Sequence, residues 1–125
     1  MHKNITIEQV EAALDMCIDA GLDTRSTLIL GDEEETIESA ERTISWWLAH
    51  KKRSAIDIGL IIAFPGSTLY KHAVRNGKIP DTVRFLRDGC PVVNLSRNMT
   101  FEQFRQIADK VSEHSGINFN IVDYS

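Results

Sequence analysis

The sequence is poor in the residues that mark several specialised classes of protein. Its 125 residues include only two cysteines, which cannot build a disulfide framework and which favour a reducing compartment. Its longest apolar run, Gly59 to Pro65, is far shorter than the roughly 20 residues of a membrane-spanning helix. The chain opens without a charged and then apolar leader, so we expect a cytoplasmic protein with no membrane partner.

Positive charge is not in excess either. Lys and Arg number 14 against 18 for Asp and Glu, and the formal net charge is −4. A dedicated nucleic-acid binder needs basic residues to neutralise phosphates, so we expect no nucleic-acid partner. The hydrophobic share of 42% is ordinary for a globular protein, and the length is typical of one domain. We therefore expect residues 1–125 to form a single domain with a genuine core.

Local signals in the first half alternate between helix and strand. Thr6-Ile7-Glu8-Gln9 has the pattern of a capping box, and the apolar residues that follow at helical spacing predict a helix over 7–20. Residues 24–30, rich in Thr, Leu and Ile, predict a strand. The acidic run 32–35 then leads into a helix near 36–50, which has one apolar stripe.

The segment 55–64 is the strongest strand signal in the chain. Its second half is apolar on both faces, as in a strand that is covered on both sides. Pro65-Gly66 ends this strand, and Ser67 is placed to cap a short helix that continues to Arg75.

The last third is expected to hold less regular structure. A loop-rich segment, 78–98, precedes a second capping box at Thr100 and a terminal helix over 100–116. Alternating apolar residues over 117–121 predict a short edge strand. Strands that alternate with helices favour an α/β fold of parallel βα units. Two parallel strands alone form a poor sheet, and both of its edges stay open. We therefore expect this chain to be part of a larger structure.

Metal-ligand spacing is absent from the sequence. No CxxC, HxxxH or HExxH occurs among its histidines and cysteines, which are His2, His50, His72, His114, Cys17 and Cys90. Cys17 lies on an apolar stripe and is typical of a small core residue. Cys90, between Gly89 and Pro91, is expected in an exposed loop, and an unreactive thiol is favoured there. No pair of nucleophile and base can be argued, so no catalytic residue is predicted.

Three further features admit a binding role beside a structural one. Gly66-Ser67-Thr68 is compatible with an anion-binding site at a helix N-terminus or with a purely structural strand-to-helix turn. The structural turn is favoured. The acidic run 32–35 suits a bound cation or a solvated loop that stabilises a helix dipole, and the loop is favoured. Trp47 follows the apolar stripe, whereas Trp46 is expected at its edge, where exposure would mark a contact with another part of the protein or with another chain.

Two stretches share their residues and their order with a known family. The first comprises Ile5-Thr6-Ile7-Glu8-Gln9-Val10, Ala20-Gly21-Leu22, Leu28-Ile29-Leu30-Gly31 and Glu35-Thr36. The second comprises Ile61-Ile62-Ala63-Phe64-Pro65-Gly66-Ser67-Thr68-Leu69-Tyr70, and the residues 76–79, 91–96 and 99–100 continue it. Over about residues 5–115 the chain resembles the C-terminal half of a radical S-adenosylmethionine (SAM) enzyme barrel. The similarity is to the cobalamin-binding branch, which includes anaerobic magnesium-protoporphyrin monomethyl ester cyclase and related methyltransferases.

The chain departs from that family at two places. Glu33-Glu34 stand where the family usually has Pro-Gly, so the loop is more acidic and less tightly turned. The CxxxCxxC loop that holds the 4Fe–4S cluster is absent, and a cluster of this kind needs three cysteine thiolates. The resemblance therefore implies a partial (half) TIM-like barrel of parallel βα units, a fragment of a six-stranded barrel. Strands 24–30 and 55–64 would be its fifth and sixth strands, and the remainder of the parent barrel would be the partner.

The resemblance also implies residues for a cofactor site. Ile29 and Gly31 match the element that packs against the SAM adenine. Ala63 and Phe64 match the turn whose backbone approaches the same ring, and Glu35 is matched within the altered loop. The parent enzyme, an oxidoreductase or methyltransferase, would use SAM and a 4Fe–4S cluster, with cobalamin as a further cofactor of the branch. We expect this chain alone to hold neither cofactor nor metal and to be inactive.

Two hypotheses about function follow. In the first, the chain is a catalytically incomplete part of a radical SAM enzyme and supplies the adenine-side wall of its SAM site. In the second, it is a free-standing small α/β binding or protein-interaction module without chemistry of its own. A half barrel leaves edge strands with unpaired backbone groups, which predicts a homodimer or larger assembly of the isolated chain.

Overall fold

The computed structural model describes residues 5–52 and 55–124, which form a two-stranded parallel sheet with helices around it. β1 (Arg25–Leu30) pairs with β2 (Ala55–Leu60), and Leu30 lies opposite Leu60. The helices of the described residues are α1 (Ile7–Asp19), α2 (Ile37–His50), α3 (Thr68–Arg75), α4 (Thr82–Arg87) and α5 (Phe101–Ser115). The predicted α/β class with parallel strands is confirmed. Two strands alone do not define a barrel.

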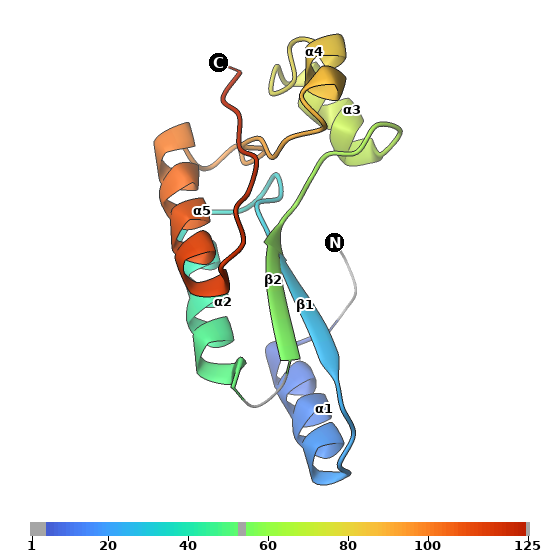
Figure 1. The fold of residues 1–125 in the computed structure, drawn as a ribbon, viewed down its shortest axis with the longest axis vertical. Coiled ribbons are helices and arrows are strands. Elements are labelled where there is room, and N and C mark those ends of the chain that lie inside the picture. The colour runs from blue at the N-terminus through green and yellow to red at the C-terminus, as the bar shows by residue number, and fades with distance from the viewer. Residues whose placement is uncertain (1–4, 53–54, 125) are drawn as a thin grey trace.

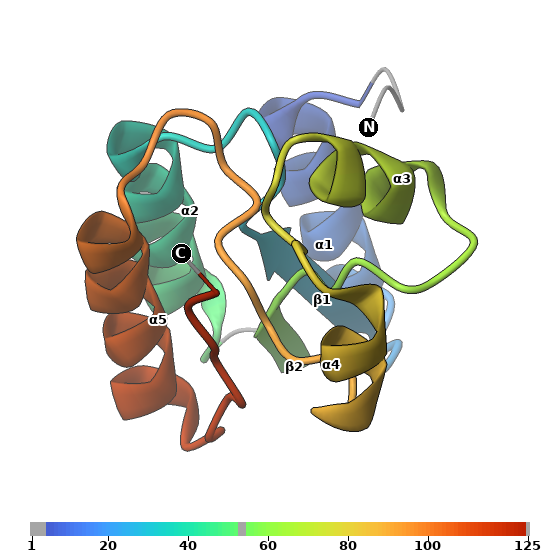
Figure 2. The ribbon, with the colours of Figure 1, turned by 90° about the horizontal axis from the view of Figure 1, so that it is seen from above.

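The sheet is covered on one face. α2 and α5 lie side by side against that face, while α3 and α4 lie beyond the carboxyl ends of the strands (Figures 1 and 2). The strand residues on the covered face are Ser26, Leu28, Leu30, Ile56, Ile58 and Leu60. On the other face Ile29 and Asp57 are exposed, and Asp57 accepts a hydrogen bond from Arg25 at 3.2 Å. The segment predicted to be covered on both sides is the second half of 55–64. There Leu60 and Ile62 pack in the main core, while Ile61 and Ala63 pack in a second cluster.

The apolar stripe of α2 joins the main core. Ala40, Ile44 and Trp47 are buried together with residues of both strands and of α5. The indole Nε1 of Trp47 donates a hydrogen bond to the carbonyl oxygen of Ile56 at 2.8 Å, so the polar atom of this buried ring has a partner. No helix among the described residues is long and apolar enough to cross a membrane.

Three capping boxes set where helices begin. The predicted boxes at Thr6 and Thr100 are both present, with Gln9 and Gln103 as their third-position partners. A third box, which sequence analysis did not identify, starts α2 at Thr36. Each box satisfies two backbone N–H groups that a helix N-terminus leaves without intrahelical partners.

β2 is shorter than predicted. The expected strand over 55–64 ends at Leu60, and residues 61–64 have irregular structure. The Ile61 N–H still donates to the Leu30 carbonyl oxygen at 2.9 Å. Because β1 ends at Leu30, the chain beyond Ile61 has no strand beside it and turns toward α3.

The segment 78–98 contains more structure than the predicted loop. Asp81 caps α4 by accepting a hydrogen bond from the Arg84 N–H at 3.0 Å. A second core cluster of Ala63, Ala73, Ile79, Phe85, Val93 and Leu95 lies around this segment. The predicted edge strand over 117–121 is reduced to a single parallel bridge between Val92 and Ile121.

The two cysteines lie in similar surroundings. Cys17 is half-buried on α1, so the prediction that it belongs to the core is wrong. Cys90 is also half-buried rather than exposed, because it packs against the second core cluster. Cys90 has a backbone φ of +53° and follows Gly89, which is also left-handed. Together the two residues change the chain direction sharply after α4.

Two phenylalanines offer a matched test of this core. Phe104 is 1% exposed and Phe64 is 59% exposed. Phe104→Ala is expected to lower the free energy of unfolding by about 3–5 kcal/mol, because it leaves a cavity between α5 and the sheet. Phe64→Ala should change it by no more than about 0.5 kcal/mol. Urea denaturation followed by circular dichroism measures both, and equal losses would contradict the described core.

Candidate functional site

Gly31 immediately follows β1 at the carboxyl edge of the sheet. Its φ of +98° lies in the left-handed region, which residues with a side chain rarely adopt. A Cβ at this position would lie 3.4 Å from Cε2 of Phe104 and 3.8 Å from Cγ2 of Ile61. Glycine is therefore favoured here by the backbone conformation, whereas a Cβ would make only ordinary van der Waals contacts.

The Glu35 carboxylate fixes the backbone at Gly31. Its Oε1 accepts a hydrogen bond from the Gly31 N–H at 3.2 Å, and its Oε2 accepts from the Ser39 hydroxyl. Ser39 belongs to the capping box of α2, so the beginning of this helix orients the carboxylate toward the end of β1. The structure thus brings together two of the residues that the resemblance singled out, Gly31 and Glu35.

The other three matched residues lie at the same end of the sheet. Ile29 is 50% exposed on the uncovered face of β1, and Phe64 is exposed in the turn that follows β2. Ala63 is only 1% exposed and lies in the second core cluster, so the structure leaves neither its side chain nor its backbone open to a ligand. Because β1 and β2 are parallel, the segments that follow them meet at one edge, where α/β proteins commonly bind ligands.

A hollow of about 610 Å³ adjoins this edge. It is lined by Asp32, Glu33, Glu34, Ile61, Thr68, Leu69 and His72. The lining combines the acidic loop after β1, the first residue after β2 and one face of α3. Its size lies in the ordinary range for a site that takes a small molecule.

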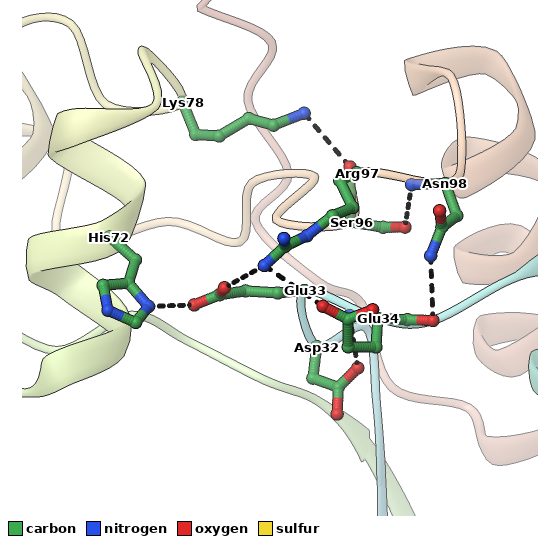
Figure 3. Close-up of polar contacts among 8 residues, drawn as sticks. All are labelled: Asp32, Glu33, Glu34, His72, Lys78, Ser96, Arg97 and Asn98. Carbon is green, nitrogen blue, oxygen red and sulfur yellow. Dashed lines mark hydrogen bonds and ion pairs between the residues drawn. The ribbon is translucent and has the colours of Figure 1, made fainter.

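Glu33 is the centre of a polar cluster beside this hollow (Figure 3). Nδ1 of His72 lies 2.8 Å from Glu33 Oε1, and Nη2 of Arg97 donates to Oε2 at 2.8 Å. Because a carboxylate accepts only, Nδ1 of His72 carries the proton of that hydrogen bond. The same Arg97 nitrogen lies 3.1 Å from Oε1 of Glu34, so one guanidinium bridges two neighbouring carboxylates.

These contacts change the chemistry of the acidic loop. The hydrogen bond from His72, together with the positive charge and hydrogen bond of Arg97, lowers the pKa of Glu33 below its usual 4.5, although burial acts in the opposite direction. The Glu33 side chain is 20% exposed. The prediction of a solvated loop is therefore wrong at Glu33, which is paired and mostly buried.

Sequence analysis did not identify His72 and Arg97 as members of this site. They lie 39 and 64 residues from Glu33 in the chain, beyond the reach of any local pattern. The available signal was indirect: the consecutive carboxylates Asp32 to Glu35 repel one another, and a nearby positive side chain reduces that repulsion.

The remaining candidates have structural roles. The Ser67 hydroxyl accepts from the Tyr70 N–H and donates to the Phe64 carbonyl oxygen, which agrees with the favoured turn. Trp46 is half-buried, donates to Glu11 at 2.9 Å and stacks on His50, so it is engaged within the chain.

No group of three or more metal-ligating residues is assembled within 5–52 and 55–124, and His2 lies outside these residues.

The lowered pKa of Glu33 predicts a pH-dependent contribution to stability. A carboxylate whose pKa is lower in the folded state stabilises the fold above its usual pKa of 4.5, and this contribution is lost as the pH falls through the lowered value. Glu33→Gln should therefore cost about 1 kcal/mol at neutral pH and progressively less in acid. Urea unfolding over a pH series measures the difference. The exposed Glu41→Gln on α2 is the control, and a parallel response of both variants would contradict the prediction.

Comparison with protein-family models, curated protein sequences and solved structures found no match to this chain. The resemblance to radical SAM barrels therefore depends on the sequence motifs themselves. The placement of Gly31 and Glu35 is compatible with that resemblance, and the α/β fold is compatible with either functional hypothesis.

Proposed function

We propose that the chain supplies the adenine-side wall of a SAM site in a radical SAM oxidoreductase or methyltransferase. The observation that carries the proposal is the left-handed Gly31, whose amide the Glu35 carboxylate holds at the carboxyl edge of a parallel pair. The spacing of these two residues belongs to the motif on which the resemblance rests. Their direct contact supports a shared role in shaping one backbone segment.

The surroundings of Gly31 suit the adenine ring. An adenine offers two apolar faces and a polar edge, so its site needs apolar side chains together with accessible backbone groups. Ile29 and Phe64 are the exposed apolar side chains at this edge, whereas Ala63, between the end of β2 and the turn, is buried. In this proposal the side chains of Ile29 and Phe64 contact the apolar faces of the ring.

The 4Fe–4S cluster does not fit the residues of this chain. Three thiolates are needed, and the chain has two cysteines, one on α1 and one after α4. We therefore derive no reaction step through a cluster, and we assign its ligands to the remainder of the parent barrel. SAM, when bound with its cluster, supplies an adenosyl radical; the residues described here would only hold and orient the adenine. None of them is assigned to cobalamin.

The alternative is a free-standing α/β binding module without catalysis. The observation in its favour is that two buried core clusters form within this chain alone. The two proposals differ in what the carboxyl edge of the sheet should bind. The first requires adenosyl specificity at Ile29 and Gly31, whereas the second requires none.

A charge at Ile29 tests the adenine contact. We expect NMR titration with SAM to shift the amides of Ile29, Gly31 and Phe64, with a dissociation constant weaker than about 1 mM, since only one side of the site is present. Ile29→Asp should abolish these shifts, because it places a charge against an apolar ring face. Val83→Asp, at an apolar α4 residue that is 60% exposed, is the matched control. Circular dichroism checks the fold of each variant.

Two results would contradict the proposal. Equal binding by the Ile29 and Val83 variants would place the ligand elsewhere. Micromolar affinity of the isolated chain would mean that the site is complete without the remainder of a barrel.

The open sheet predicts self-association of the isolated chain. β1 has β2 on one edge and no second strand partner among the described residues, and Ile29 is exposed on the uncovered face. Exposed edges of this kind pair with other chains, and a two-fold contact is the simplest closed form. Light scattering at micromolar concentration should show a dimer or larger species. A monomer of 14.1 kDa that unfolds cooperatively would contradict this prediction.

A further inference from the structure

The segment 96–98 lies against the loop 32–35 and bonds to it residue by residue. The Arg97 N–H donates to the Glu33 carbonyl oxygen at 3.0 Å, in addition to the side-chain pair. The Asn98 amide nitrogen donates to the Glu34 carbonyl oxygen at 3.1 Å, and the Ser96 hydroxyl donates to the Glu35 carbonyl oxygen at 2.5 Å. Each of the three loop residues therefore has its own partner in the segment.

These bonds lead directly to the proposed adenine site. Ser96 holds the backbone of Glu35, and the Glu35 carboxylate accepts from the Gly31 N–H. Ser96 is fully buried, so its bond to Glu35 is shielded from water. Two consecutive hydrogen bonds thus connect the 96–98 segment to Gly31.

The segment itself is held rigidly. Buried Asn94 accepts from the Ser96 N–H at 3.2 Å and donates to the Met99 carbonyl oxygen at 2.9 Å. The Asn98 N–H donates to the Ser96 hydroxyl oxygen at 2.9 Å, and Nζ of Lys78 donates to the Ser96 carbonyl oxygen at 3.1 Å (Figure 3). A segment held by these hydrogen bonds can act as a template for the loop that it contacts.

The loop needs such a template. It carries four adjacent acidic residues, Asp32 to Glu35, whose like charges repel, and it has no proline to restrict its backbone. Within the loop Asp32 accepts from the Glu34 N–H at 3.0 Å, but this bond fixes only one turn. Arg97 bridges Glu33 and Glu34 and so offsets their repulsion.

We propose that Ser96, Arg97 and Asn98 are positioning residues for the adenine site: they hold the loop 32–35, and through Glu35 they hold the Gly31 amide in its left-handed conformation. This inference rests on the proposed function for its ligand, but its structural part concerns the free chain. It predicts that weakening the 96–98 contacts loosens Gly31 without unfolding the core.

Amide hydrogen exchange of the free chain tests the structural part. In the double variant Arg97→Ala/Asn98→Ala the Gly31 amide should exchange about tenfold faster or more, because local opening of the loop becomes easier. The Val111 amide, in the buried middle of α5, reports global opening and should keep its rate. If Arg97→Lys replaces Arg97→Ala in the double variant, part of the protection of the Gly31 amide should return, since lysine retains the positive charge.

Arg105→Ala is the matched control for the loss of an exposed arginine. Arg105 forms an ion pair within α5, with Asp109 at 3.6 Å, and its side chain is 49% exposed against 59% for Arg97. This control should leave the Gly31 exchange rate unchanged. An unchanged Gly31 rate in the double variant would overturn the inference, and so would equal acceleration at Gly31 and Val111.

Titration with SAM separates this inference from the proposed function. If wild type binds SAM at Ile29 and Gly31, the double variant should bind several-fold more weakly, and equal affinity would overturn the positioning role. If wild type shows no binding, the proposed function fails, while faster exchange at Gly31 still supports the template role of 96–98.

Discussion

The parallel pairing of β1 and β2 is the constraint on which the rest of the structure depends. Two strands that run in the same direction need a connection that returns along the sheet, and α2 makes this return against one face. The covered face becomes the core, and the other face receives no helix from the described residues. The same constraint brings both carboxyl ends to one edge. The loop 32–35 and the segment 61–64 therefore meet there, and α3 and the 96–98 segment pack around them.

Most of the fold could be predicted because its signals are local. The capping boxes at Thr6 and Thr100 and the apolar stripe of α2 each act within a few residues, and the structure has helices at all three places. The residue at which β2 ends could not be predicted from local signals. Residues 61–64 have the apolar composition of a buried strand. A strand also needs a second strand to pair with, and β1 ends at Leu30. The length of β2 thus depends on its partner.

The contacts of the candidate site also divide into short-range ones, which the sequence indicates, and long-range ones, which it does not. Gly31 and Glu35 lie within one motif, four residues apart, and their hydrogen bond is a short-range contact. The partners of Glu33 come from α3 and from the segment before α5, so they depend on how the whole chain packs. A run of acidic residues in a sequence is therefore ambiguous. It describes a solvated surface or an ion-paired cluster according to which cations the fold brings to it.

The loop 32–35 is held in its conformation by side-chain contacts and contains no proline. A proline acts mainly on the unfolded chain, by removing conformations before folding begins. The contacts of Glu33 with His72 and Arg97 exist only in the folded state, and they join three segments that are distant in the chain. The backbone at Gly31 consequently depends on the placement of α3 and of the 96–98 segment. If either element moved, the charged side chains would transmit the movement to the backbone at the end of β1. A Pro-Gly turn is locally rigid and would not transmit it.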